Sequence, residues 1–370
     1  MTTRITKSII TVLCVFSILL MAGCGRQSPG EAPSDENING QEAHQYEYEI
    51  YEEYIEYEIY EEYAPTQNNQ GIHGLISVVE YGGNRAYIIG SIHIGCESWY
   101  PLNPIVEAAI DRADIFAFEI DLAAEGGPCI REYDPCEYDC ICALLDMMFL
   151  SEGTTLEDFL PAEDFKLFME NLRTYPFLNI DAIATFRPTT ILEVILYEIV
   201  APSLGLSSAH SIDMYVFNRA EARERPTIGL TDVNDHIAFI SGMPDEYQFA
   251  TARYFTDFET MLDEVDQLAY IYVTQDIETL TQMVRADLAE AYEAYMAGEI
   301  SAAGLALARY WHYTVGNYRS AFFARQIAAL LRETEEPTVF FVTVGIAHLT
   351  REVNVFYMLR EMGFEVVGLY

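Results

Sequence analysis

In the segment YIIGSIH at residues 87–93, an apolar strand pattern runs directly into a glycine turn and a histidine. Residues 340–348, FFVTVGIAH, repeat the arrangement near the other end of the chain. Each segment predicts a buried strand that ends in G-x-x-H, where the glycine permits a close backbone approach. Open α/β sheets bind ligands beyond the carboxyl ends of their strands, so we expect His93 and His348 to face one site.

A third apolar strand pattern, IFAFEI at residues 115–120, carries Glu119 near its end. Two imidazoles and one carboxylate at strand ends predict a divalent metal site at His93, Glu119 and His348, and the His2Glu set of catalytic zinc leaves a position for water. Each of these residues alone is weak evidence for a metal site. A lone histidine after a strand is more often structural, and a glutamate there can cap the next helix. The repeated motif favours the metal site.

Strand and helix patterns alternate at both ends of the folded region. Residues 81–84, YGGN, are a hairpin turn signal between two strands. The predicted strands span residues 75–80, 86–90, 115–120, 226–230, 338–344 and 364–369. The predicted helices at the two ends span residues 104–112, 317–332 and 350–362. Residues 155–333 are mostly helical in pattern. We therefore predict an α/β fold: a mixed β-sheet with G-x-x-H motifs at strand ends in its N- and C-terminal halves, and a large helical insertion between them.

The N-terminus has the order of an export signal. Two basic residues precede the apolar residues 9–21, and Ala22-Gly23 leads directly into Cys24. The apolar run is shorter than the ~20 residues that a membrane-spanning helix needs. The small pair before cysteine resembles the bacterial lipobox, so we expect residues 1–24 to be a signal peptide and Cys24 to be lipidated. Simple secretion and an uncleaved anchor are the alternatives. The lipid would hold the protein on the cell membrane, facing the extracytoplasmic side.

Residues 25–70 are predicted to be an acidic, Tyr-rich, disordered linker. The unit YEIYEEYIE at residues 48–56 recurs as YEIYEEYAP at residues 57–65. Its tyrosine period of three matches neither a helix nor a strand, and its like charges repel one another. A spacer between membrane and folded domain is the favoured interpretation; a tyrosine-rich segment that binds wall polymer or cations is the other.

Charge excludes one class of partner. The chain has 370 residues, 51% of them hydrophobic, and a net charge of -38. Residues 71–370, the predicted folded domain, carry 17 Lys and Arg against 46 Asp and Glu. Nucleic acid binding requires the opposite sign, so we expect no nucleic acid partner. An acidic surface favours cationic ligands or metal ions, or serves solubility alone.

Three of these motifs together resemble the pattern of a known family. The motifs GSIH at residues 90–93, AFEID at residues 117–121 and GIAH at residues 345–348 agree in order, spacing and strand context with the TraB/GumN family, which includes the Tiki-type metalloproteases. The resemblance covers about residues 71–370.

Two further segments resemble the family and one departs from it. Ser211-Ile212-Asp213 is similar to a G-I-D segment, and residues 317–319, NYR, are similar to an Arg-containing helix. Residues 229–231 read GLT where the family has G-L-E, so Thr231 replaces a glutamate.

The resemblance implies that His93, Glu119 and His348 bind metal or perform catalysis on a peptide or protein substrate. Tiki-type members depend on manganese or cobalt, and zinc is a further option. Glu119 is a ligand or the general base. Arg319 is the candidate for a substrate carboxylate or a developing oxyanion, with a structural ion pair as its alternative. Asp213 is a site candidate or simply starts a helix.

The cysteines and the remaining histidines give less evidence about function. Four cysteines cluster within an insertion after the Glu119 strand: Cys129, Cys136, Cys140 and Cys142. Outside the cytoplasm disulfides are favoured over zinc, because the C-x6-C-x3-C-x-C spacing lacks the paired C-x2-C pattern. Cys96 is left as a free thiol or a soft ligand. His236 could join a second site, although a solvated helix start explains it better.

These patterns predict a surface-tethered, divalent-metal-dependent hydrolase, most simply a peptidase. The chain has no G-x-S-x-G, H-E-x-x-H or G-x-x-x-x-G-K-[ST] motif, so serine hydrolase, ordinary zincin and P-loop chemistry lack support. The alternative is a non-catalytic lipoprotein that binds haem or a peptide, as in related ChaN-type folds. A third interpretation is a degenerate structural relative, favoured by Thr231.

Overall fold

The computed structural model describes residues 72–369 apart from 73, 123–147, 176–177, 233–242, 245–247, 250–257, 285–287 and 299. The predicted signal, Cys24 and the linker lie outside the described residues. The same holds for His236 and the cysteine cluster at residues 129–142. Within the described ranges, no helix combines the length and apolar composition needed to cross a membrane.

The centre of the fold is a six-stranded mixed sheet with the strand order β4-β3-β5-β2-β1-β6. Its strands are β1 (Ser77–Tyr81), β2 (Asn84–Ser91), β3 (Ile115–Ile120), β4 (Thr227–Thr231), β5 (Val339–Gly345) and β6 (Val366–Gly368). The neighbours β4, β3, β5 and β2 pair in parallel, whereas β1 is antiparallel to both β2 and β6. The α/β prediction with a mixed sheet is confirmed.

The first two strands form the predicted hairpin. Tyr81 pairs with Asn84 across the turn, and both central residues have positive φ, 59° at Gly82 and 100° at Gly83. Glycine enters this region without steric cost, which is why two-residue hairpin turns select it. The Asn84 side chain ties the hairpin to the rest of the fold, because its amide group donates to the carbonyl oxygen of Leu331 at 3.0 Å.

Helices cover both faces of the sheet and fill the long segment between β3 and β5. The helices nearest the sheet are α2 (Pro104–Arg112), α8 (Ile212–Glu221), α15 (Arg319–Glu333), α16 (Ala347–Thr350) and α17 (Val355–Glu361). The other α-helices are α4 (Ala162–Leu172), α5 (Ile180–Ile183), α6 (Pro188–Val194), α7 (Ala201–Ser203), α11 (Phe258–Thr274), α12 (Ile277–Val284), α13 (Leu288–Met296) and α14 (Ala302–Tyr310). Three 3-10 turns, η2 (Glu97–Trp99), η4 (Leu156–Asp158) and η6 (Ser208–His210), and two π-helices, η5 (Ile195–Val200) and η8 (Trp311–Tyr318), complete the described elements.

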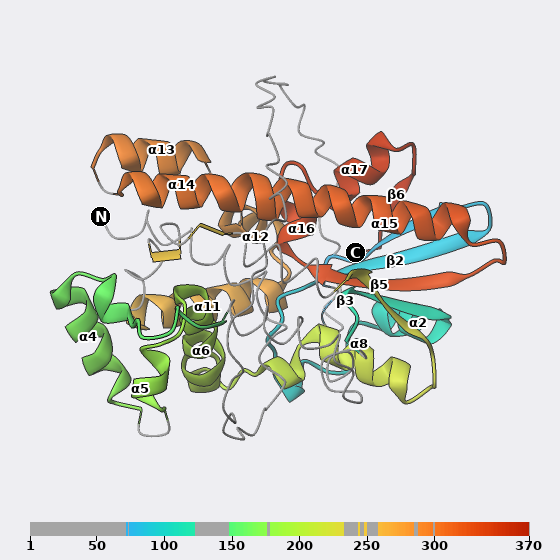
Figure 1. Cartoon of the computed structure of the whole chain (residues 1–370). Helices are drawn as coiled ribbons and strands as arrows, with labels where there is room; N and C mark the ends of the chain where they lie inside the picture. The colour runs from blue at the N-terminus through green and yellow to red at the C-terminus, as the bar shows by residue number, and fades with distance from the viewer. Residues whose placement is uncertain are drawn as a thin grey trace, which may run out of the picture.

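Figure 1 shows how these elements are layered. The continuous run from α14 into α15 crosses one side of the sheet, and α2 and α8 lie on the other. Helices α4, α5, α6 and α11 form the helical part at the far end of the molecule. Fully buried aromatic rings fill the space between sheet and helices, among them Phe116, Phe323 and Phe341. Burial of each such side chain stabilises the folded state by about 1.5–3 kcal/mol.

Two predicted helix starts differ from the structure. The helix predicted at residues 350–362 is wrong at its start, because the chain between α16 and α17 leaves helical geometry: Arg351 is extended, with ψ 164°. The Asn354 side chain then accepts a hydrogen bond from the backbone nitrogen of Tyr357 and begins α17. The helix predicted at residues 317–332 begins as an α-helix at Arg319, directly after the π-helix η8.

Candidate active site

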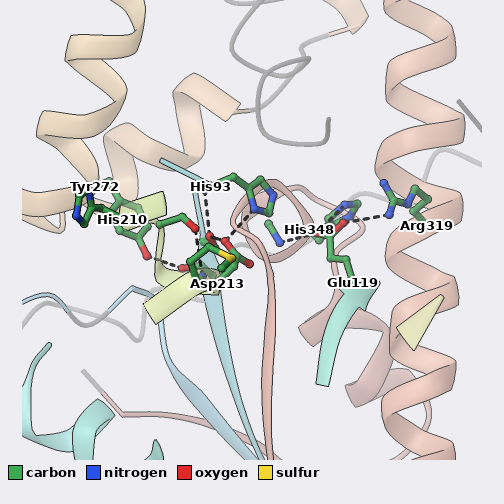
Figure 2. A network of polar contacts seen from close by, with 12 residues as sticks. His93, Glu119, His210, Asp213, Tyr272, Arg319 and His348 are labelled. Carbon is green, nitrogen blue, oxygen red and sulfur yellow. Dashed lines mark hydrogen bonds and ion pairs between the residues drawn. The ribbon is translucent and has the colours of Figure 1, made fainter. Parts of the chain in front are cut away.

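The parallel register brings three strand ends to one edge of the sheet. Ser91 at the end of β2 pairs with Gly345 at the end of β5, and Phe118 of β3 pairs with Thr343 of β5. His93 follows β2 and His348 lies in α16, directly after β5. In Figure 2 both histidine rings lie between Asp213 on one side and the Glu119–Arg319 pair on the other.

The two G-x-x-H segments contact each other directly. The backbone nitrogen of Ile346, in the second motif, donates to the carbonyl oxygen of Ser91, in the first, at 2.7 Å. A Cβ on Gly90 would overlap Cδ1 of Ile346 and lie 3.2 Å from the carbonyl oxygen of Gly74. Glycine is therefore required at residue 90 because the second motif packs against its backbone.

His93 is buried and held at both its backbone and its ring. It is 3% exposed and has φ 58°, a conformation uncommon outside glycine. Its backbone nitrogen donates to Oγ of Ser91 at 3.1 Å, and its Nδ1 lies 2.9 Å from Oδ2 of Asp213. The Ser91 hydroxyl donates to the same Asp213 oxygen. Residues from β2 and α8 thus fix this histidine together.

Asp213 lies in the first turn of α8 and also contacts the site. Ser211 is the N-cap, since its side chain accepts from the backbone nitrogen of Met214. The Asp213 carboxyl is therefore available to the site. Burial acts to raise its pKa, but His93 and the hydrogen bonds from His93 and Ser91 outweigh burial, so the pKa lies below the usual value.

His348 is the second buried imidazole, 1% exposed. Its Nδ1 lies 3.0 Å from Oγ of Ser320 on α15, and the Phe323 ring packs edge-on against it at 4.9 Å between centroids. Burial, followed by the positive charges of Arg319 and Arg351, holds the pKa of His348 well below its ordinary range. His348 is consequently neutral and can offer a nitrogen lone pair.

Glu119 is 1% exposed and forms a buried ion pair with Arg319. Arg319 Nη2 donates to Glu119 Oε2 at 3.0 Å, and the backbone nitrogen of Gly345 donates to Oε1 at 2.6 Å. The Arg319 guanidinium also lies over the Phe323 ring, 5.0 Å from its centroid. The ion-pair alternative for Arg319 is therefore the arrangement present in the structure.

Two side chains of this cluster, His348 and Glu119, offer donor atoms that suit a divalent metal ion. Nε2 of His348 is buried, makes no hydrogen bond within the described part of the chain, and lies 3.8 Å from Oε1 of Glu119. That gap is wider than a hydrogen bond and within what two metal bonds of about 2.1 Å span. Among the described residues, however, no three His, Cys, Asp or Glu side chains are grouped closely enough to hold a metal. His93 is bound to Asp213 instead.

Thr231 and Cys96 are two further residues that the sequence singles out. Thr231, the departure from the family pattern, pairs with Ile120 at the end of β4, and its buried hydroxyl has no hydrogen-bond partner in the region described. Cys96 is a free thiol, 3.1 Å from Oγ of Ser98.

Sequence reasoning missed two hydroxyls, those of Ser91 and Ser320. Ser91 lies inside the first motif, between glycine and histidine, where any small residue satisfies the pattern. Ser320 follows Arg319 on the buried stripe of α15, and a serine among the apolar residues of that stripe was the only signal in the sequence, which does not indicate a contact with His348.

The described residues define an α/β protein whose parallel strands end in a buried cluster of two histidines, a glutamate and an arginine. The model of the TraB/PrgY/gumN family matches residues 75–367, and the chain belongs to this family. Neither a curated protein nor a solved structure matches the chain.

Proposed function

We propose that this protein is a surface-tethered, divalent-metal-dependent hydrolase that cleaves peptides, with His93, Glu119 and His348 as its metal residues. The observation that carries the proposal is the neutral, buried Nε2 of His348 facing Glu119 Oε1 across 3.8 Å at the sheet edge where His93 also lies. Membership of the TraB/PrgY/gumN family supports it. Manganese or cobalt is the favoured ion, and zinc is the alternative.

A divalent ion bound there would supply Lewis-acid chemistry, lowering the pKa of a bound water and polarising a scissile carbonyl. The side chains of the chain supply the rest. His348 offers a neutral lone pair, and Glu119 offers Oε1 while Oε2 stays on Arg319. Burial of all three side chains keeps bulk water away and strengthens their electrostatic effects. Arg319 fixes the carboxylate and adds positive charge beside a developing oxyanion.

The cellular setting forms part of the proposal. Lipidation at Cys24 would anchor the chain to the membrane, and the acidic linker would extend the domain outward from it. Substrates would then be extracytoplasmic peptides or proteins. The acidic balance of residues 71–370 favours metal cations and basic substrates over acidic ones.

The test combines metal content with cleavage. The purified full chain is loaded with manganese or cobalt and incubated with a peptide library, and new termini are identified by mass spectrometry. The proposal expects cleavage that a chelator abolishes. His93→Ala with His348→Ala should lose both bound metal and cleavage. Metal content that is unchanged in this double variant would refute the site assignment.

The role of Glu119 can be separated with one further variant. Glu119→Gln keeps an oxygen donor and loses the ability to accept a proton. Retained metal with lost cleavage assigns Glu119 as the general base, whereas lost metal assigns it as a ligand.

A second candidate function is non-catalytic binding of haem or a peptide. The Glu119–Arg319 ion pair favours it, because a carboxylate already neutralised by a guanidinium has less charge to offer a metal. In the same library experiment a binder would retain peptides on the protein and produce no new termini.

A further inference from the structure

We propose that Asp213 and Ser320 are positioning residues, each of which holds Nδ1 of one site histidine so that its Nε2 is presented to the site. The inference rests on the proposed function in taking His93 and His348 as the ligating histidines. Beyond the proposed metal residues, two more residues, one on α8 and one on α15, then take part in the site.

The first arrangement is a closed ring of hydrogen bonds around His93. The His93 backbone N–H donates to Ser91 Oγ, the Ser91 hydroxyl donates to Asp213 Oδ2, and the same oxygen contacts His93 Nδ1 at 2.9 Å. The ionised Asp213 carboxylate can only accept, so the single hydroxyl hydrogen of Ser91 is directed to it while Ser91 Oγ accepts from His93. The ring therefore fixes the positive-φ backbone of His93 and its imidazole together.

The second arrangement holds His348 from the opposite side of the site. Ser320 is completely buried on α15, with Oγ 3.0 Å from His348 Nδ1. The Phe323 ring, one helical turn further along α15, packs against the imidazole edge-on. A hydroxyl and an aromatic ring on one helix face thus set the orientation of this second histidine.

Nδ1 contacts matter because a neutral imidazole carries one N–H and one lone pair. When an acceptor holds the hydrogen at Nδ1, the lone pair is at Nε2, the form that binds metal or accepts a proton. Such outer partners typically change metal affinity by about 10- to 100-fold when removed. Asp213→Asn would present an amide N–H to Nδ1 and favour the opposite tautomer.

The first measurement is nitrogen-15 NMR of the histidine rings in the metal-free full chain, with signals assigned by His93→Ala and His348→Ala. The proposal expects a protonated Nδ1 and an unprotonated Nε2 for both residues. Asp213→Asn should change the protonation of the His93 ring nitrogens, and Ser320→Ala should change that of the His348 ring nitrogens. A protonated Nε2 on either residue in the unsubstituted protein overturns the proposal without any need for a variant to fold.

The second measurement is titration of the same proteins with manganese or cobalt. Asp213→Asn and Ser320→Ala should each weaken binding about 10- to 100-fold. Ser301→Ala is the matched control: it removes the side-chain N-cap of α14, away from Asp213 and Ser320, and should lower stability while leaving affinity within about threefold. Equal affinity in all variants overturns the proposal. If the unsubstituted protein binds no metal, the proposed function fails and the NMR pattern alone decides the positioning roles.

Discussion

Arg319 and Glu119 show at the scale of single residues how the site depends on buried charge. Arg319 is 5% exposed and Glu119 is 1% exposed, so neither charge has bulk water to stabilise it. Burial lowers the pKa of Arg319, and the adjacent Glu119 carboxylate acts against that effect. Each side chain is therefore tolerable only because the other is present.

Arg319→Met is expected to lower the free energy of unfolding by about 3–5 kcal/mol, because it leaves Glu119 buried and uncompensated. Combining it with Glu119→Leu should recover part of that loss. Urea denaturation of the single and double variants measures both effects. Arg325→Met, the same change at an exposed position on α15, serves as control and should cost no more than about 0.5 kcal/mol. A double variant as unstable as the sum of its parts would contradict the pairing.

The local pattern predicted which strand ends lie at one edge of the sheet better than it predicted the contacts of the residues there. The common placement of the two histidines and Glu119 could be predicted because the carboxyl ends of parallel strands share one edge. The contact of Arg319 with Glu119 joins residues 200 positions apart, and no local pattern encodes it. The same holds for the Ser320 hydroxyl, whose role depends on where α15 crosses the sheet.

At the scale of elements, strands were predicted more accurately than helix starts. Continuous apolar runs marked the parallel strands, and the glycine pair marked the hairpin. The π-helix η8 changes the helical register just before Arg319, and a periodicity of 3.6 does not reveal it. The late start of α17 depends on Asn354 as N-cap, which a short sequence window did not single out.

Gly83→Ala tests the hairpin. Residue 83 has φ 100°, where a Cβ is strained, so the substitution should destabilise the fold by about 1–2 kcal/mol. Gly82→Asn is the matched variant, because asparagine tolerates the left-handed φ of 59° at that position and should cost less. Thermal denaturation followed by circular dichroism compares the two. Equal losses would show that the turn does not require glycine at residue 83.

Glu193, in the helical insertion, is expected to make the free energy of unfolding depend on pH. This α6 residue is buried, and Oε1 has no hydrogen-bond partner in the described ranges. Burial raises its pKa well above 4.5, so above that pH the folded state holds a proton that the unfolded state loses. Its contribution to stability is therefore present at low pH and is lost as pH rises.

Glu193→Gln removes this titration. The variant should gain stability relative to the unsubstituted protein as pH rises above 4.5, by about 1.4 kcal/mol per pH unit until the folded carboxyl ionises. Urea denaturation at a series of pH values measures the difference. Glu198→Gln, an exposed change on the adjoining η5, should alter stability by less than about 0.5 kcal/mol. A difference that is constant with pH would contradict the buried assignment.

At the scale of the whole molecule, charge is the dominant feature. Residues 71–370 carry 46 acids against 17 basic residues, a surplus that repels itself in the compact state. Ion pairs between α2 and α8 place one of those basic residues next to two acids: Arg219 bonds Glu107 at 2.6 Å and Asp111 at 2.8 Å.

The midpoint of thermal unfolding is therefore expected to rise by several degrees when salt increases from about 0.01 to 0.15 M, as the Debye length falls from about 30 to 8 Å. Differential scanning calorimetry of the full chain measures the shift. Potassium chloride and choline chloride should act alike if screening is the cause. A midpoint that falls with salt would contradict net repulsion as the main surface effect.

Locating a bound ion shows directly whether Glu119 and His348, with His93 beside them, form the proposed metal site. Crystals of the protein grown with cobalt can be measured at the cobalt absorption edge, where anomalous scattering locates the ion. The proposal predicts one strong peak bonded to Nε2 of His348 and to an oxygen of Glu119. A crystal of the fully folded protein with no peak there, or with cobalt only on surface carboxylates, would contradict it.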